Sequence, residues 1–214
     1  MVRAATAVLA LLLAPGCRGE RHDGRPTRVA CLGDSNTFAL PPKTGVGWCE
    51  LLDVRFDGEG WKARNFSYMG GTVSGEPTAA YTTAADHIAR AEAAWNPDVY
   101  VLAYGTNDLK HLAPAEVVAA YERHRDALIA RGHRVLVATT PPRFPPASPD
   151  AGVTVLNSLL RQRIPPRDLV DFDSIADTAD YDVDGVRLLE RDGIHINLQG
   201  QEKRARAAHE ALVR

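Results

Sequence analysis

Short apolar segments alternate with longer amphipathic ones from Thr27 to the end of the chain, and this alternation constrains the fold more than any other feature. The short segments have the apolar runs of buried strands and cover Arg28–Leu32, Lys62–Tyr68, Asp98–Ala103, Val135–Ala138 and Leu169–Phe172. The longer segments predict helices over Trp48–Phe56, Tyr81–Trp95, Pro114–Arg131, Gly152–Arg163 and Leu198–Leu212. The repeated strand–helix order predicts an α/β fold with a parallel sheet covered by helices on both faces. In such sheets the functional site lies at the carboxyl ends of the strands.

The first 17 residues have the pattern of a signal peptide. Arg3 supplies a positive charge, and the apolar run of eleven residues from Ala4 to Ala14 is shorter than the about 20 that a membrane-spanning helix needs. The run leads to Leu13-Ala14-Pro15-Gly16-Cys17, which resembles a bacterial lipobox, where the cysteine becomes the lipidated first residue after cleavage. We therefore expect an exported, membrane-anchored bacterial lipoprotein, periplasmic or at the cell surface. An ordinary secretory signal that contains a cysteine is the alternative.

The rest of the chain divides into a tether at residues 18–26 and one domain at residues 27–214. The tether is polar, rich in Gly, Arg and Pro, and without hydrophobic periodicity. The domain is long enough for one sizeable core and too short for two. The chain contains 25 basic and 27 acidic residues, a near balance that gives no indication of nucleic-acid binding.

Cys31 and Cys49 are the two cysteines outside the signal segment. An oxidising compartment would permit a disulfide between them. Cys31 lies inside a predicted central strand, where a free cysteine packs like a small apolar side chain, and we favour the free form. The sequence has no Cys-x-x-Cys pair or Cys/His cluster of the kind that binds zinc, so we expect no metal.

Four polar stretches supply the groups that ester hydrolysis by an activated serine requires, and three of them directly follow predicted strands. They are Gly33-Asp34-Ser35-Asn36-Thr37, Asn65–Gly71, Gly105-Thr106-Asn107-Asp108 and Asp192-Gly193-Ile194-His195. Ser35 is the candidate nucleophile, and it needs a base that removes its proton. His195 is the candidate base, and Asp192 is placed to accept from its Nδ1–H and orient the ring. The alternatives are a turn serine and a solvated loop histidine beside a turn-forming Asp-Gly pair.

The same stretches supply three candidate donors for an oxyanion. They are the N–H of Ser35 at a turn into a helix, the N–H of Gly70 or Gly71, and the side-chain amide of Asn107. The alternatives are an ordinary Gly-Gly turn and a helix cap made by Asn107 and Asp108. The other six histidines are interpreted as surface or helix-end residues, and they are His22, His87, His111, His124, His133 and His209.

Together the four stretches resemble the serine, glycine, GxND and DxxH blocks of the SGNH (GDSL-like) hydrolase family, over about Thr27 to the C-terminus. The resemblance implies a three-layer α/β/α flavodoxin-like fold with a five-stranded parallel sheet, and ester hydrolysis without a metal or cofactor. The implied roles are catalysis by Ser35, His195 and Asp192, an oxyanion hole of Ser35, Gly70 and Asn107, and support from Asp34, Gly105 and Asp108. Many members have a different pair where this chain has Asn36-Thr37, and we expect the mechanism to be unaffected.

Four further residues are candidates for the walls of the site. Arg143 and Phe144 follow the fourth predicted strand, where they could attract an anionic group or contact an acyl group, but we favour solvated loop positions for both. Trp48 and Tyr68 are possible pocket linings, and core packing is the favoured interpretation of each.

The function predicted from the sequence is an exported serine esterase that hydrolyses small acyl or acetyl esters. Its partners would be a small ester substrate and, through Cys17, the membrane. A lysophospholipase or thioesterase ranks second, because no long apolar insertion would build a large lipid lid. A lipid-anchored binding module on a hydrolase scaffold ranks third, because the catalytic positions are intact. Acyl transfer to a sugar instead of water stays open, since the acceptor depends on pocket shape.

Overall fold

The computed structural model describes residues 24–39, 45–75, 82–142, 151–174, 182–183, 186–187 and 194–214. Its centre is a five-stranded sheet in the order β2-β1-β3-β4-β5, and every neighbouring pair is parallel. The strands are β1 (Thr27–Gly33), β2 (Trp61–Asn65), β3 (Val99–Ala103), β4 (Arg134–Ala138) and β5 (Leu169–Val170). The predicted parallel α/β fold is therefore confirmed, and all five predicted strands are present with shifts at their ends.

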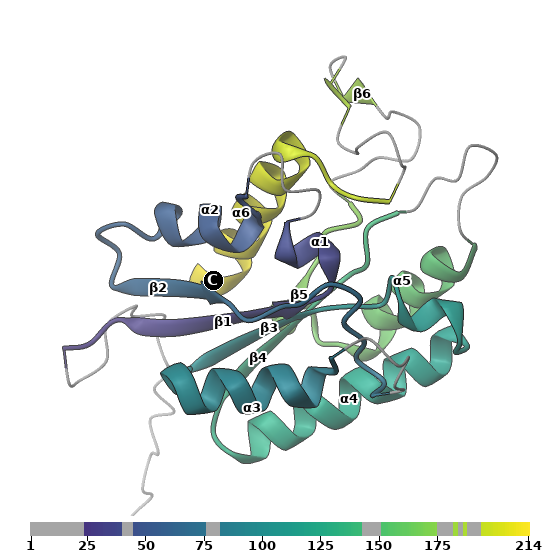
Figure 1. Cartoon of the computed structure of the whole chain (residues 1–214), viewed down its shortest axis with the longest axis horizontal. Helices are drawn as coiled ribbons and strands as arrows, with labels where there is room; N and C mark the ends of the chain where they lie inside the picture. The colour runs from purple at the N-terminus through teal and green to yellow at the C-terminus, as the bar shows by residue number, and fades with distance from the viewer. Residues whose placement is uncertain are drawn as a thin grey trace, which may run out of the picture.

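Helices cover both faces of this sheet, with α2 and α6 on one side and α3, α4 and α5 on the other (Figure 1). The helices are α1 (Ser35–Phe38), α2 (Trp48–Arg55), α3 (Ala84–Trp95), α4 (Pro114–Ala130), α5 (Ala151–Arg163) and α6 (Leu198–Val213). Two 3-10 helices, η1 (Asp108–Lys110) and η2 (Pro166–Asp168), and a small antiparallel pair, β6 (Asp182–Val183) with β7 (Val186–Arg187), complete the described elements. No helix among the described residues combines the length and apolar character needed to cross a membrane.

Strand β1 shows how the two cores are divided. Side chains alternate between the faces of a strand, so Ala30 and Leu32 pack in the core under α3 and α4, whereas Val29 and Cys31 pack in the core under α2 and α6. All four are fully buried. A strand buried on both faces reads as the continuous apolar run seen in the sequence.

At two of the elements whose ends differ from the predicted ranges, side chains bond to the backbone. Helix α3 begins at Ala84 and not at Tyr81, since Thr83 accepts from the N–H of Asp86 while the Asp86 carboxylate accepts from the N–H of Thr83. Strand β2 ends at Asn65 because the Asn65 side-chain oxygen accepts from the N–H of Ser67, 3.0 Å away, and turns the chain.

Cys31 and Cys49 form a disulfide, so the expectation of free cysteines is wrong. Cys31 faces the layer that contains α2, and Cys49 lies on the buried side of that helix, with Cα atoms 6.1 Å apart. The periodicity of a strand and of a helix shows that each cysteine is buried, but not that the two meet. The bond closes a loop of 18 residues, and a loop of this length stabilises the folded state by about 3 kcal/mol in the chain-entropy model.

Candidate active site

The serine turn lies at the carboxyl end of β1. Asp34 is the N-cap of α1, and its side chain accepts from the N–H of Asn36 at 2.9 Å. A Cβ on Gly33 would lie 2.2 Å from Thr37 Oγ1 and 2.5 Å from the carbonyl oxygen of Ala103, so only glycine fits this close approach. The turn therefore places Ser35 as the first residue of α1, with only 9% of its surface exposed.

His195 meets Ser35 across 160 residues of sequence, with Nε2 3.0 Å from Oγ. The histidine lies in the segment that leads into α6, and that helix begins at Leu198 behind the cap of Asn197. A separation of 3.0 Å is hydrogen-bond distance, the reach that a base needs to take the hydroxyl proton. Asp192, the predicted orienting acid, lies outside the described residues.

Asn36 connects the serine turn to the histidine segment, a role that the sequence did not reveal. Its Oδ1 accepts from the N–H of Ile196, the residue after His195, at 3.2 Å. Its carbonyl oxygen accepts from Gln201 Nε2 at 3.1 Å, and Gln201 Oε1 accepts from the N–H of Trp48 at 3.1 Å. Asn36 thus bonds to the backbone beside His195. The prediction that the Asn36-Thr37 pair leaves the mechanism unaffected stays a prediction.

Asn107 lies at the carboxyl end of β3, with a nearly buried side chain. Its Nδ2 donates to the carbonyl oxygen of Gly71 at 3.3 Å, and its Oδ1 accepts from Lys110 Nζ at 3.0 Å. The amide makes no capping bond to η1. One side-chain hydrogen of the amide bonds to Gly71, and the second is available to another acceptor.

Asp108 holds the backbone that follows the glycine pair. Its two carboxylate oxygens accept from the N–H groups of Val73 at 3.2 Å and Ser74 at 2.9 Å. Its side chain is thus turned toward a neighbouring loop, and the capping interpretation is wrong for this residue. Asn107 and Asp108 together attach the glycine loop to the end of β3.

Gly70 and Gly71 have different backbone roles. Gly71 N–H donates to the carbonyl oxygen of Tyr68 at 3.2 Å, and a Cβ at Gly71 would lie 2.8 Å from the carbonyl oxygen of Gly33. Gly70 has a φ of +73°, which favours glycine. Within the described part of the chain, no acceptor bonds to the N–H of Gly70. Gly70 is therefore the better oxyanion donor of the pair.

His87 packs against this glycine loop and is fully buried. Of its two interpretations, surface or helix-end, the surface one is wrong, and the residue is the fourth of α3. Its Nδ1 lies 2.7 Å from Tyr104 Oη and its Nε2 lies 2.6 Å from Thr82 Oγ1. Burial lowers the pKa of His87 to about 4, because an imidazolium would lose its hydration. A Cβ on Gly71 would lie 3.1 Å from the His87 ring, so the neutral histidine packs directly against the backbone of the glycine loop.

Asp34 and Gly105 complete the predicted supporting set. Burial raises the pKa of the Asp34 carboxyl, while its bond from Asn36 N–H and the nearby charge of Arg204 oppose the rise. Burial lowers the pKa of Arg204 to about 10, and its guanidinium lies 5.0 Å from the centre of the Phe172 ring. Gly105 has a φ of +115°, and a Cβ there would lie 2.3 Å from Thr140 Oγ1.

The predicted wall residues are placed differently from one another. Trp48 is fully buried and packs edge-on against Phe172, so the core-packing interpretation is confirmed. Its Nε1 donates to Thr37 Oγ1 at 3.3 Å. Tyr68 is 40% exposed and lies against the exposed Phe38 with ring centres 5.9 Å apart, so its core interpretation is wrong. Arg143 and Phe144 lie outside the described residues.

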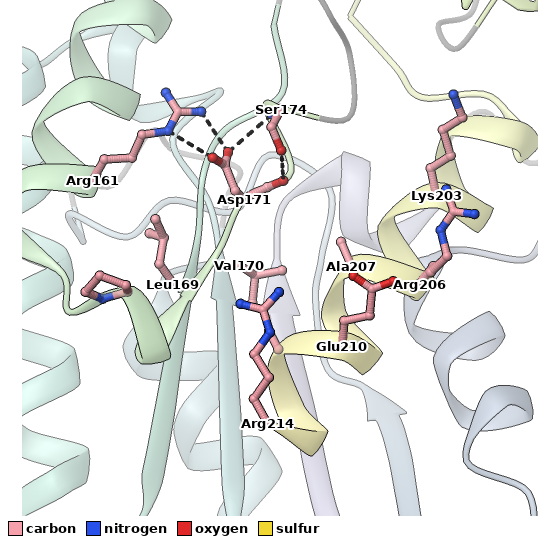
Figure 2. Close-up of a pocket in the computed structure, with 12 residues that line it drawn as sticks. Arg161, Leu169, Val170, Asp171, Ser174, Lys203, Arg206, Ala207, Glu210 and Arg214 are labelled. Atoms are coloured by element: carbon pink, nitrogen blue, oxygen red, sulfur yellow. Dashed lines mark hydrogen bonds and ion pairs between the residues drawn. The ribbon is translucent and has the colours of Figure 1, made fainter.

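A cavity of about 640 Å³ lies at the outer edge of the sheet, between α5, β5 and α6 (Figure 2). In this cavity Arg161 faces Asp171 and bonds to it at 2.7 Å and 3.0 Å, and Arg214 extends beside Val170. Ser35, Asn107 and His195 are not among the residues that line it. The cavity is therefore separate from the candidate active site.

The model of the GDSL-like lipase/acylhydrolase family matches residues 31–203, a range that includes all four predicted stretches. A search of curated proteins finds no significant match. Solved structures are similar in fold. One is a member of the lipolytic protein G-D-S-L family from Veillonella parvula, which is 20% identical, with a TM-score of 0.67 over 86% of this chain and 97% of that one.

Two further solved structures are described as esterases. An acetyl esterase mutant crystallised with an acetate ion is 18% identical, with a TM-score of 0.63 over 87% of this chain and 96% of its own. A carbohydrate esterase of family 3 from Talaromyces cellulolyticus has the same identity, TM-score and coverage. At these identities the likeness concerns the fold, which is the arrangement that brings the ends of β1, β2 and β3 together.

Proposed function

Because this chain belongs to the GDSL-like lipase/acylhydrolase family, we propose that it is an exported serine esterase that hydrolyses small acyl or acetyl esters. The observation that carries the proposal is the 3.0 Å separation between Ser35 Oγ and His195 Nε2 at the carboxyl ends of the strands. The acetyl esterase among the solved structures of this fold supports the choice of a short acyl group.

In the proposed mechanism, Ser35 Oγ attacks the ester carbonyl while its proton moves to His195 Nε2. The oxyanion accepts from the N–H of Ser35, the N–H of Gly70 and the side-chain amide of Asn107. His195 then gives the proton to the leaving alcohol as the ester C–O bond breaks, and the acyl group stays bonded to Ser35 Oγ. Water attacks the acyl-enzyme by the same route, releasing the acid and restoring the serine. Asp192 would accept a hydrogen bond from the Nδ1–H of His195 throughout, and the proton would stay on the ring.

Export and lipidation at Cys17 are part of the proposal. The disulfide between Cys31 and Cys49 supports export, because such bonds persist in oxidising compartments and are rare in a reducing cytosol. Labelling with a radioactive fatty acid would test the anchor. Incorporation into the wild-type chain and none into Cys17→Ser is the expected result, and equal labelling of both would contradict it.

A second candidate function, hydrolysis of longer acyl chains, is supported by the apolar side chains around the serine turn. Phe38, Tyr68 and Met69 are each about 40% exposed, although apolar side chains of this size are commonly buried. Phe38 is three residues after Ser35, and Met69 precedes Gly70. Such a surface fits an acyl chain of the kind that a lysophospholipase or thioesterase accepts.

One experiment separates the two functions and tests the serine mechanism. Residues 18–214 would be assayed with p-nitrophenyl esters from acetate to octanoate, with Ser35→Ala in parallel. The proposal predicts turnover that is greatest on acetate and collapses in the variant. A maximum at octanoate would favour the second candidate. Equal rates for the variant and the wild type would contradict a serine mechanism.

A further inference from the structure

Lys110 lies beside Asn107, and the short helix η1 places it there. Asn107 is the N-cap of η1, and Lys110 is its last residue. In a 3-10 helix the side chains of residues i and i+3 lie on the same side, and the Lys110 N–H donates to the Asn107 carbonyl oxygen at 3.2 Å. The lysine stem therefore turns back over the asparagine, with Nζ 3.0 Å from Oδ1.

The contacts at the two ends of the Asn107 amide allow only one orientation. Oδ1 faces an ammonium, which only donates, and Nδ2 faces the Gly71 carbonyl, which only accepts. Rotating the amide by half a turn would place NH₂ against NH₃⁺ and one carbonyl oxygen against another. Both contacts would then be repulsive, so Lys110 and Gly71 together hold Nδ2 on the side of the glycine loop.

We propose that Lys110 is a positioning residue for the oxyanion hole, which fixes the orientation of the Asn107 amide. The catalytic part of this inference rests on the proposed esterase function, whereas the orientation of the amide does not. Lys110 is exposed. Its removal should therefore change the site without unfolding the chain. An amide donor such as Asn107 is preorganised only when neighbouring groups prevent its rotation.

The kinetic test compares Lys110→Met, Lys110→Arg and the control Lys62→Met on p-nitrophenyl acetate. Lys62 is also exposed, but it lies near the beginning of β2, at the opposite end of the strands from the site. Lys110→Met should lower kcat about 10-fold with little change in KM, because the oxyanion forms only in the transition state. Lys110→Arg keeps a donor and should recover most of the loss, and Lys62→Met should match the wild type. An unchanged kcat in Lys110→Met would overturn the proposal.

A double-variant comparison tests whether Lys110 acts through Asn107. If it does, Lys110→Met should have little further effect once Asn107 is alanine, so Asn107→Ala and the double variant should have similar kcat. If the lysine substitution lowers kcat by the same factor in both backgrounds, Lys110 acts independently of Asn107 and the proposal is wrong.

A crystal structure of Lys110→Met tests the inference without any assay. The proposal predicts that the Asn107 amide leaves its single orientation, with the bond from Nδ2 to the Gly71 carbonyl oxygen lengthened or lost in at least one conformer. An amide that stays as in the wild type would overturn it. If the wild type hydrolyses no ester, the proposed function fails alone, and this comparison still decides the role of Lys110.

Discussion

The two sides of the candidate site are held in different ways. On the nucleophile side, long-range bonds connect distant segments: Asn36 reaches Ile196 and Gln201, and the disulfide joins β1 to α2. On the oxyanion side, Asn107 and Asp108 bond to a neighbouring loop, and Lys110 fixes Asn107 from three residues away. The nucleophile side is therefore joined to the C-terminal part of the chain, 160 and 165 residues away. The bonds on the oxyanion side span 36 residues or fewer, and one buried histidine packs beside them.

The largest effect should follow a direct change on the oxyanion side. Asn107→Ala removes a donor to the transition state and should lower kcat by about 10²–10³. The thermal midpoint should change little, because the Asn107 side chain makes two hydrogen bonds to the described residues. Steady-state kinetics on p-nitrophenyl acetate would measure the loss. A kcat within a factor of two of the wild type would exclude Asn107 from the oxyanion hole.

The disulfide tests the nucleophile side. Replacing both Cys31 and Cys49 with alanine should lower the free energy of unfolding by about 3 kcal/mol, because the unfolded chain regains the entropy of the open loop. Urea unfolding of the variant, with reduced wild type as the matched control, would measure this. Esterase activity well below the midpoint should persist. An unchanged midpoint in both samples would argue against the bond.

Acid should weaken the oxyanion side through His87. Its folded pKa is lowered to about 4 from 6.5, so between these values the unfolded chain binds more protons than the folded one. The histidine's contribution to the free energy of unfolding is therefore complete above about pH 6.5 and is lost as the pH falls to about 4, with an upper limit of about 3 kcal/mol. Urea unfolding across this range should show a shallower pH dependence in His87→Gln than in the wild type. Parallel curves would contradict a buried neutral histidine.

The smallest effect tests the connection between the serine turn and the histidine segment. Asn36→Leu removes the acceptor for the Ile196 N–H and should lower kcat about 10-fold, because a small displacement of a base is costly. Gln201→Leu breaks the neighbouring bonds without contacting the histidine segment, so it should lower the thermal midpoint more than kcat. Equal kcat losses in the two variants would contradict a role of Asn36 in placing the histidine segment.

The sequence predicts the elements of this fold well, because each strand and helix has its own local periodicity. Gly132, for example, follows α4 with a φ of +87°, as its position after the helix indicates. The candidate site could be assembled in outline because Ser35, Asn107 and His195 each lie in a short recognisable stretch. What the sequence lacks is information on which residues meet.

The features that could not be predicted from the sequence depend on contacts between separate elements of the fold. The bond from Ile196 to Asn36 spans 160 residues, the burial of His87 depends on Tyr104 and Thr82, and the disulfide depends on how α2 lies on β1. Tyr68 lies three residues beyond the end of β2, and its side chain is exposed. Lys110 is the exception, since the spacing Asn-x-x-Lys after a strand is a local signal that could have been found.

Covalent labelling tests the central claim, that His195 activates Ser35, most directly. The protein would be treated with diisopropyl fluorophosphate, and peptides would be mapped by mass spectrometry in the wild type, Ser35→Ala and His195→Ala. We expect one adduct per wild-type chain, on Ser35, with none in Ser35→Ala and greatly slowed labelling in His195→Ala. Labelling at another residue, or at the same rate without His195, would contradict it.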